Sequence, residues 1–201
     1  DLGCSSGLWS RHFSSQGLRV ISLDLDQKAL RVGQRIATGQ GSSWPAYCQA
    51  SAETLPLSDD TFDAIICLDM LDIVPNDRQA VEELFRVLKP GGQLLITVIS
   101  KHRRQTWTKI AFAEHLRNYS RPELDALLKE AGFILSASIT FYRRIGGLAR
   151  EVGALSDRSG LGKIPGLNAA ISLVLSSLTR LDTLLPEHSQ DGGFGLSAYK
   201  P

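Results

Sequence analysis

Cysteine is scarce in this sequence, and its spacing excludes two common uses. The chain of 201 residues contains three cysteines, Cys4, Cys48 and Cys67. An odd and widely spaced set predicts neither a disulfide framework nor a zinc site built from paired cysteines. The other possible ligands show no metal-binding spacing, so no metal is expected. Reduced thiols are typical of cytoplasmic proteins, and we expect this chain to be cytoplasmic.

An excess of charge of one sign is also lacking. The chain has 22 basic and 21 acidic residues, which leaves a formal net charge of +1. A protein that binds nucleic acid usually presents a strongly basic face, so no nucleic-acid partner is expected. The basic cluster at residues 101–104 is interpreted as a solvated turn after a strand, with a local basic patch as the alternative.

Long apolar runs are missing as well. The best candidate for a membrane span is Leu167–Leu185, but Asn168, Arg180 and Asp182 interrupt it together with several serines and threonines. A helix that crosses a bilayer needs about 20 mostly apolar residues. We therefore expect no transmembrane span.

Short apolar runs alternate with amphipathic stretches along most of the chain. Strands are expected at residues 18–25, 46–50, 62–68, 93–99, 133–142 and 194–199, and helices at 27–38, 78–88 and 121–131. Strands separated by helices require right-handed crossovers and therefore a parallel sheet. The pattern predicts an α/β fold of the doubly wound, Rossmann-like type, with a mainly parallel sheet and an antiparallel last strand.

Two segments depart from this regular pattern. The chain opens on Asp1-Leu2-Gly3-Cys4, which has the pattern of a strand end that leads into a turn. We therefore expect the first strand to be truncated in this sequence. Residues 143–193 interrupt the last two strands, where the pattern would otherwise predict a tight hairpin. They are expected to form a helical insertion within a single domain that spans residues 1–201.

Small residues concentrate in the turn between Asp1 and Gly7. Glycine and serine at this place let the backbone approach a ligand closely, and the N–H groups at the start of a helix attract polar or anionic groups. Asp24 ends the next predicted strand, where doubly wound folds place an acidic group on the hydroxyls of a ribose. Helix capping is the alternative role, and it fits Asp26 about as well as Asp24.

Several segments in this order resemble the class I S-adenosylmethionine-dependent methyltransferases that act on small molecules and lipids. DLGCSSG (1–7) is similar to the cofactor turn of that family and SLDLD (22–26) to its second-strand segment. SAETLPLSDDTFDAI (51–65) is similar to its adenine-side loop. RVLKPGGQLLITV (86–98) and RPELDALLKEAGF (121–133) are similar to two later units, so the resemblance covers roughly residues 1–142.

The resemblance implies S-adenosylmethionine as the cofactor and methyl transfer to a small-molecule or lipid-like acceptor. It places on the cofactor side Asp1, Gly3, Cys4, Gly7, Asp24, Leu25, Ser51, Ala52, Glu53 and Leu68. Two positions depart from the family pattern. Ser5 stands where the family often has a second glycine, and Ser51 stands where it usually has an aspartate that contacts the adenine amino group.

The acceptor side is less defined by the sequence. The candidates there are Asp69, Asp72, His102, His115 and Tyr119. The two aspartates fit equally well as caps at a helix start. Many relatives have Glu-His where this chain has Asp72-Ile73, so a histidine base is absent at that point and no catalytic residue is assigned. The lack of metal-ligand spacing argues against metal-dependent methylation of the catechol type.

The insertion carries an apolar stripe whose role stays open. Apolar residues recur every three or four positions through residues 164–185, which predicts an amphipathic helix. We interpret the stripe as a packing face on the domain or on a second subunit of a homodimer. A lid over the acceptor site and peripheral contact with a membrane are the alternatives.

Two other functions are compatible with parts of the sequence. A non-catalytic cofactor-binding or scaffold module could keep the same fold. A nicotinamide-dependent oxidoreductase would share the glycine turn and the acidic strand end, but the KPGG and SAETLP segments argue against it.

Overall fold

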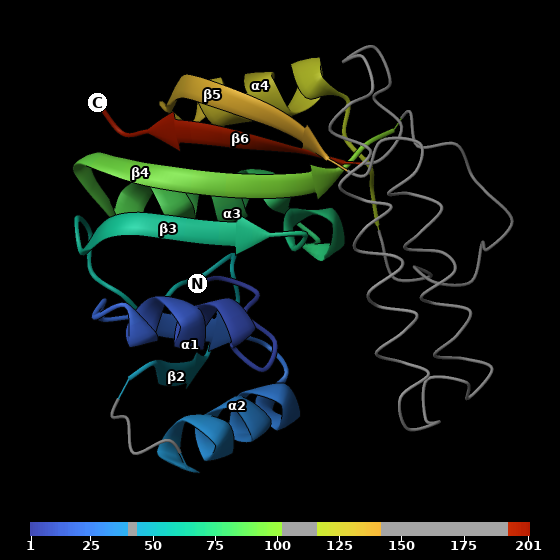
Figure 1. Ribbon diagram of the computed structural model, residues 1–201. Coiled ribbons are helices and arrows are strands. Elements are labelled where there is room, and N and C mark those ends of the chain that lie inside the picture. The colour runs from blue at the N-terminus through green and yellow to red at the C-terminus, as the bar shows by residue number, and fades with distance from the viewer. Residues whose placement is uncertain (40–43, 102–115, 142–192) are drawn as a thin grey trace, which may run out of the picture.

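The computed structural model describes residues 1–39, 44–101, 116–141 and 193–201 as an α/β sandwich (Figure 1). Its elements in chain order are α1 (Leu8–Ser15), β1 (Ile21–Asp24), α2 (Gln27–Gly39), β2 (Ala46–Gln49), β3 (Phe62–Leu68), the 3-10 helix η1 (Leu71–Ile73), α3 (Asp77–Val87), β4 (Leu88–Ile99), α4 (Arg121–Glu130), β5 (Ile134–Phe141) and β6 (Gly193–Tyr199).

The strands form two groups that meet at one residue. β1 pairs with β2 and β3 pairs with β4, in both cases in parallel, and β6 lies antiparallel between β4 and β5. Leu2 forms parallel bridges to Leu23 of β1 and to Cys67 of β3. The predicted fold class, a mainly parallel sheet with an antiparallel last strand, is confirmed.

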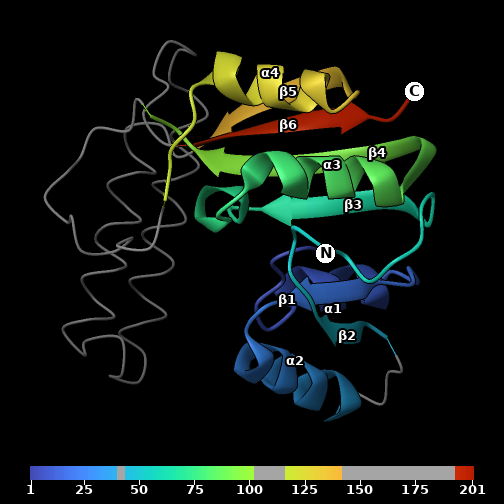
Figure 2. The ribbon, with the colours of Figure 1, turned by 180° about the vertical axis from the view of Figure 1, so that it is seen from behind.

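Helices cover both faces of the sheet. α3 and α4 lie on the face that is turned toward the viewer in Figure 2, and α1 lies on the opposite face, which is turned toward the viewer in Figure 1. Between the sheet and α3 the core is apolar, and Leu84 of α3 and Leu94 and Ile96 of β4 are almost completely buried. Each such side chain contributes about 1.5–3 kcal/mol by leaving water. This core holds the strand ends in place.

An apolar cavity of about 470 Å³ separates β1 from β3 on the amino-terminal side of Leu2. Ile21 and Leu23 line it from β1, and Ile65 and Ile66 line it from β3. Within β3, Ile65 and Cys67 are buried and Ile66 is half-buried.

Most element bounds agree with the prediction, and β4 is the main exception. The predicted strand began at residue 93, whereas β4 begins at Leu88 because Leu88 pairs with Phe62. The Lys-Pro-Gly-Gly segment comes soon after the end of α3 at Val87 and forms an irregular strand edge in which Gly91 has φ +77°. α1 and η1 were not predicted.

Some predictions fall outside the described residues. His102, His115 and the apolar stripe at 164–185 lie there, as does the insertion at 143–193 apart from Gly193. Among the helices in the described ranges, none combines the length and apolar character needed to cross a bilayer.

Candidate functional site

The turn that follows Leu2 wraps around the end of β1. The N–H groups of Gly3 and Cys4 both donate to the carbonyl oxygen of Leu23, at 2.8 and 3.1 Å. Gly7 closes the turn by donating to the carbonyl of Cys4 at 2.7 Å, and it is the N-cap of α1. The side chain of Asp1 accepts a hydrogen bond from Ser10 of α1. The turn is thus fixed to the sheet on one side and to α1 on the other.

Close packing on both sides explains the small residues of the turn. Gly3 has φ +72°, and a Cβ there would lie 2.4 Å from Cγ of Met70. Gly7 has φ +74°, and a Cβ there would lie 2.7 Å from the hydroxyl of Tyr47. Gly33 of α2 packs against the outside of the turn, where a Cβ would lie 2.3 Å from the carbonyl oxygen of Ser6. No larger residue fits at these three positions without moving backbone or buried side chains.

The carboxylate of Asp24 faces the turn. It accepts hydrogen bonds from the N–H of Ser5 at 2.7 Å and from the N–H of Asp26 at 2.9 Å. Asp26 instead accepts from Lys28 and Ala29 at the start of α2, at 2.8 and 3.3 Å. Asp26 therefore has the capping role that the sequence left open between the two aspartates, and Asp24 is turned toward the predicted cofactor side.

Ser5 adopts a backbone conformation that glycine adopts more easily. Its φ is +51°, in the left-handed region. This conformation costs an ordinary residue about 1–2 kcal/mol, and the bond from the Ser5 N–H to Asp24 offsets part of that cost. The conformation gives a physical reason for the glycine that the resembling family often has at this position.

The loop after β2 brings Ser51, Ala52 and Glu53 to the same edge of the sheet. The hydroxyl of Ser51 accepts from the N–H of Glu53 at 3.2 Å, and Ala52 is buried. A carboxylate oxygen of Glu53 accepts from the N–H of Asn76, directly before α3, at 2.7 Å. Leu25, which follows Asp24, is 64% exposed and presents an apolar surface.

The two predicted acceptor-side aspartates, Asp69 and Asp72, both follow the end of β3, but their environments differ. Asp69 follows Leu68 with φ +51°, and it accepts a hydrogen bond from the hydroxyl of Thr97 at 2.8 Å. Asp72 is fully buried in η1, and its carboxylate accepts from the N–H of Ile99 at 3.1 Å. Asp69 is exposed, so only Asp69 offers a solvent-accessible carboxylate.

Tyr119 lies beside the same edge, bound to the start of α3. Its hydroxyl donates to Asp77 at 2.7 Å, and its side chain is buried. Burial, followed by the hydrogen bond to Asp77, raises the pKa of the Tyr119 phenol above its ordinary value. The phenol is therefore protonated at neutral pH.

The thiols near the turn are protonated too. Burial is the main cause that raises the pKa of Cys4 to about 12, and the charge of Asp24 adds to it. Burial also raises the pKa of Cys67 to about 12, with further contributions from Asp72 and Asp69. Neither side chain is a thiolate nucleophile near neutral pH. Within the described residues, no group of three or more histidine, cysteine, aspartate or glutamate side chains is placed to hold a metal ion.

The sequence-based prediction did not include several residues that shape the site. Met70, Tyr47 and Gly33 pack against the turn from three separate elements, and no local pattern signals them. Glu83 and Arg86 hold the loop after β2. Their spacing of three residues on a helix is a recognisable ion-pair pattern, and Arg86 lies within the segment that carried the family resemblance.

A glycine-rich turn, followed by an acidic residue at the end of the next strand, is typical of α/β domains that bind a nucleotide-containing cofactor. Residues 1–96 match the family model described as a methyltransferase domain. The ubiquinone biosynthesis O-methyltransferase of Alkalilimnicola ehrlichii is 32% identical to this chain over 148 residues, which are 67% of this chain and 60% of that protein. The protein of the same name from Pseudomonas fluorescens is 30% identical over 145 residues, which are 66% of this chain and 62% of that protein.

The chain belongs to the class I S-adenosylmethionine-dependent methyltransferases. The structure of phosphoethanolamine N-methyltransferase 2 from Haemonchus contortus, in complex with S-adenosyl-L-methionine, has the same fold. It matches with a TM-score of 0.73 and 20% identity over all of this chain and 48% of that one. The chain spans about 60% of the length of the two curated relatives.

Proposed function

We propose that this chain transfers the methyl group of S-adenosylmethionine to an oxygen atom of a small-molecule or lipid-like acceptor. The observation that carries the proposal is the carboxylate of Asp24, held against the glycine turn by its bonds to Ser5 and Asp26. The names of the two relatives, both O-methyltransferases, favour oxygen as the attacked atom.

The residues around Asp24 fit the cofactor. An ionised carboxylate has about four acceptor positions, and two of them are used by backbone N–H groups, so two are left for a vicinal diol such as that of ribose. The exposed side chain of Leu25 offers an apolar surface for a planar ring. Ser51 and Ala52 border the same edge and would lie beside the adenine.

Leu68 and the turn residues Asp1, Gly3, Cys4 and Gly7 would surround the methionine part. When bound, the cofactor supplies a methyl group attached to a positively charged sulfur. The sulfur is a good leaving group. The protein then has to orient the acceptor in line with that methyl group and to exclude water. We place the exposed carboxylate of Asp69 on the acceptor side, where it can accept the proton of a hydroxyl. The insertion at 143–193 is proposed as the acceptor lid.

Methyl transfer from radiolabelled S-adenosylmethionine tests the function directly. The acceptors are a phenol with an apolar tail and the matching aniline, with the same tail. We expect label in the phenol and little in the aniline. Label in the aniline alone would refute the oxygen assignment. Binding of S-adenosylmethionine without transfer to any acceptor in a broad screen would favour the non-catalytic module instead.

Tyr119→Phe separates a structural role from a chemical one. Loss of the hydrogen bond to Asp77 is expected to lower the free energy of unfolding by about 1 kcal/mol. Because the raised pKa keeps the phenol protonated at neutral pH, we expect no change in the pH profile of methyl transfer between pH 6 and 9. Urea denaturation and rate measurements check the two parts, and a displaced pH profile would assign Tyr119 to the acceptor chemistry.

A further inference from the structure

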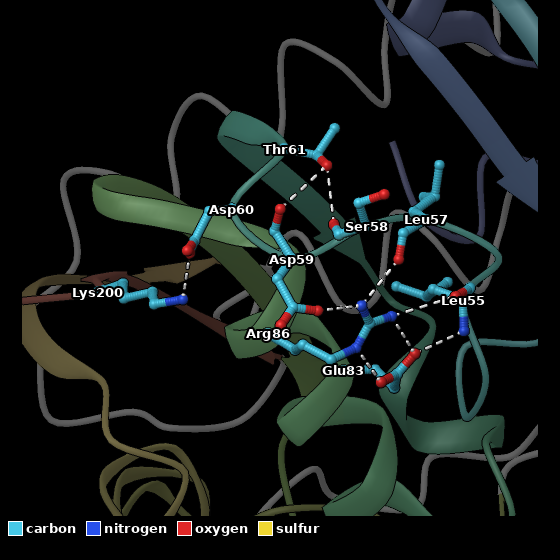
Figure 3. Close-up of polar contacts among 9 residues, drawn as sticks. All are labelled: Leu55, Leu57, Ser58, Asp59, Asp60, Thr61, Glu83, Arg86 and Lys200. Atoms are coloured by element: carbon cyan, nitrogen blue, oxygen red, sulfur yellow. Dashed lines mark hydrogen bonds and ion pairs between the residues drawn. The ribbon is translucent and has the colours of Figure 1, made fainter.

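One ion pair on α3 holds the backbone of the loop that leads from β2 to β3 (Figure 3). Arg86 donates to the carbonyl oxygens of Leu55 and Leu57, at 3.1 and 2.8 Å. Glu83 accepts from the N–H of Leu55 at 2.7 Å. This part of the loop pairs with none of the described strands. Two side chains of α3 therefore provide the hydrogen-bond partners for three of its backbone groups.

The two side chains also hold each other. Nε of Arg86 donates to one oxygen of Glu83 at 2.6 Å, and Nη2 donates to the other at 2.9 Å. Nη1 of Arg86 also donates to Asp59 at 2.7 Å. The hydrogen bond from Arg86 is the main cause that lowers the pKa of Glu83, and Glu83 in turn raises the pKa of Arg86. Both groups therefore stay ionised, and the guanidinium group is held by four partners, Leu55, Leu57, Asp59 and Glu83.

The loop has a second attachment at the other end of the same helix. Glu53 accepts from the N–H of Asn76, and the side chain of Asn76 in turn caps α3 by accepting from Gln79. The segment from Ser51 to Leu57 is therefore held at both ends by α3. Backbone that is fixed before a ligand arrives does not lose its freedom on binding, so affinity and selectivity both gain.

We propose that Glu83 and Arg86 are positioning residues that set the selectivity of the site for adenine by fixing the loop that carries Ser51 and Ala52. This inference rests on the proposed function, which places adenine beside that loop. Neither side chain reaches the edge residues itself. Arg86 acts through the backbone of Leu55 and Leu57, and Glu83 acts through the backbone of Leu55.

Substitution of Arg86 by lysine tests the proposal in the full chain. Lysine keeps the charge but replaces a planar fork with a single ammonium group, which cannot hold Leu55, Leu57 and Glu83 together. The probes are S-adenosylhomocysteine and S-inosylhomocysteine, which differ at the 6-position of the purine. We expect wild type to prefer the adenosyl compound by about tenfold or more. In Arg86→Lys, affinity for the adenosyl compound should fall about tenfold, or 1.4 kcal/mol, and the preference should approach one.

The ratio of the two dissociation constants distinguishes positioning from general loosening. If Arg86→Lys weakened the binding of both compounds equally, or the binding of neither, the inference would be overturned. Glu83→Gln keeps the shape and folds with less disturbance, and it should reduce the preference in the same direction. Ser51→Ala should reduce the preference in wild type and add little in the Arg86→Lys background, because the loop is already displaced there.

The matched control lies on the same helix. Arg78 pairs with Glu130 at 2.6 Å on the surface, with side chains 59% and 52% exposed, and it does not contact the loop. Arg78→Lys should leave both dissociation constants unchanged, and a loss of preference there would overturn the specific role of Arg86. A wild-type chain that bound neither compound would overturn the proposed function together with this inference. Wild-type binding with an unchanged ratio in Arg86→Lys would overturn the inference alone.

Discussion

Gly3→Ala is expected to abolish measurable binding of S-adenosylmethionine and to lower the free energy of unfolding by about 2–5 kcal/mol. Two costs add at this position. A residue with a Cβ at φ +72° costs about 1–2 kcal/mol, and the contact of 2.4 Å with Met70 forces a shift in a packed site, which costs a further 1–3 kcal/mol or so. Because the N–H groups of Gly3 and Ser5 hold the turn to Leu23 and Asp24, displacement of the turn also displaces the residues proposed to bind the cofactor. Calorimetric titration and urea denaturation measure the two effects.

A second glycine separates these two costs. Gly17 has φ +87°, but a Cβ there would meet nothing within 4 Å. Gly17→Ala should therefore show only the backbone cost, about 1–2 kcal/mol, with cofactor affinity unchanged. Adding Met70→Gly to Gly3→Ala should restore part of the affinity, because it removes both the Cγ and the Cβ of Met70, which the new Cβ would meet at 2.4 and 2.7 Å. If the double variant bound no better than Gly3→Ala, the clash would not be the cause.

Asp24→Ala is expected to weaken cofactor binding about a hundredfold, or roughly 2.7 kcal/mol. Hydrogen bonds to an ionised group contribute about 1.5–3 kcal/mol, and the site would lose the acceptors for the ribose hydroxyls. The variant also leaves the N–H of Ser5 without its partner. Asp24→Asn keeps the shape and one acceptor oxygen, so we expect an intermediate loss. Dissociation constants from calorimetry provide the measurement, and unchanged affinity in Asp24→Ala would remove this residue from the site.

Asp26→Asn provides the control for Asp24. Asp26 caps α2 by accepting from Lys28 and Ala29. Its substitution should lower stability by a few tenths of a kcal/mol or so, since asparagine is also a good cap. Cofactor affinity should not change. An equal loss of affinity in the two variants would mean that the effect comes from the charge near the turn and not from contact with the ligand.

Much of the fold could be predicted because its signals are local. The apolar run of β3 agrees with the observed Phe62–Leu68, and the helix expected at 121–131 agrees with α4, Arg121–Glu130. The early start of β4 could not be predicted, because it depends on the pairing of Leu88 with Phe62, which is a contact between distant segments. α1 has only eight residues, too few for a clear periodic pattern.

The same distinction applies to the site. Asp24 and the glycine turn belong to adjacent segments, so their sequence pattern predicts their proximity. The choice between Asp24 and Asp26 needed coordinates, since two carboxylates two residues apart have the same local signal. The approach of Met70 to Gly3 and of Tyr47 to Gly7 depends on packing between elements. No pattern within a single element contains that information.

The first residues of α3 connect two parts of the site that are distant in sequence. The N–H of Asn76 binds Glu53, from the loop assigned to the cofactor, and the carboxylate of the next residue, Asp77, binds Tyr119, from the segment beside the acceptor edge. A ligand that moves the start of this helix therefore changes the energy of both attachments. Thermodynamic linkage makes such an effect equal in both directions. We expect acceptor binding to alter the affinity for S-adenosylmethionine by the same factor as S-adenosylmethionine alters the affinity for the acceptor.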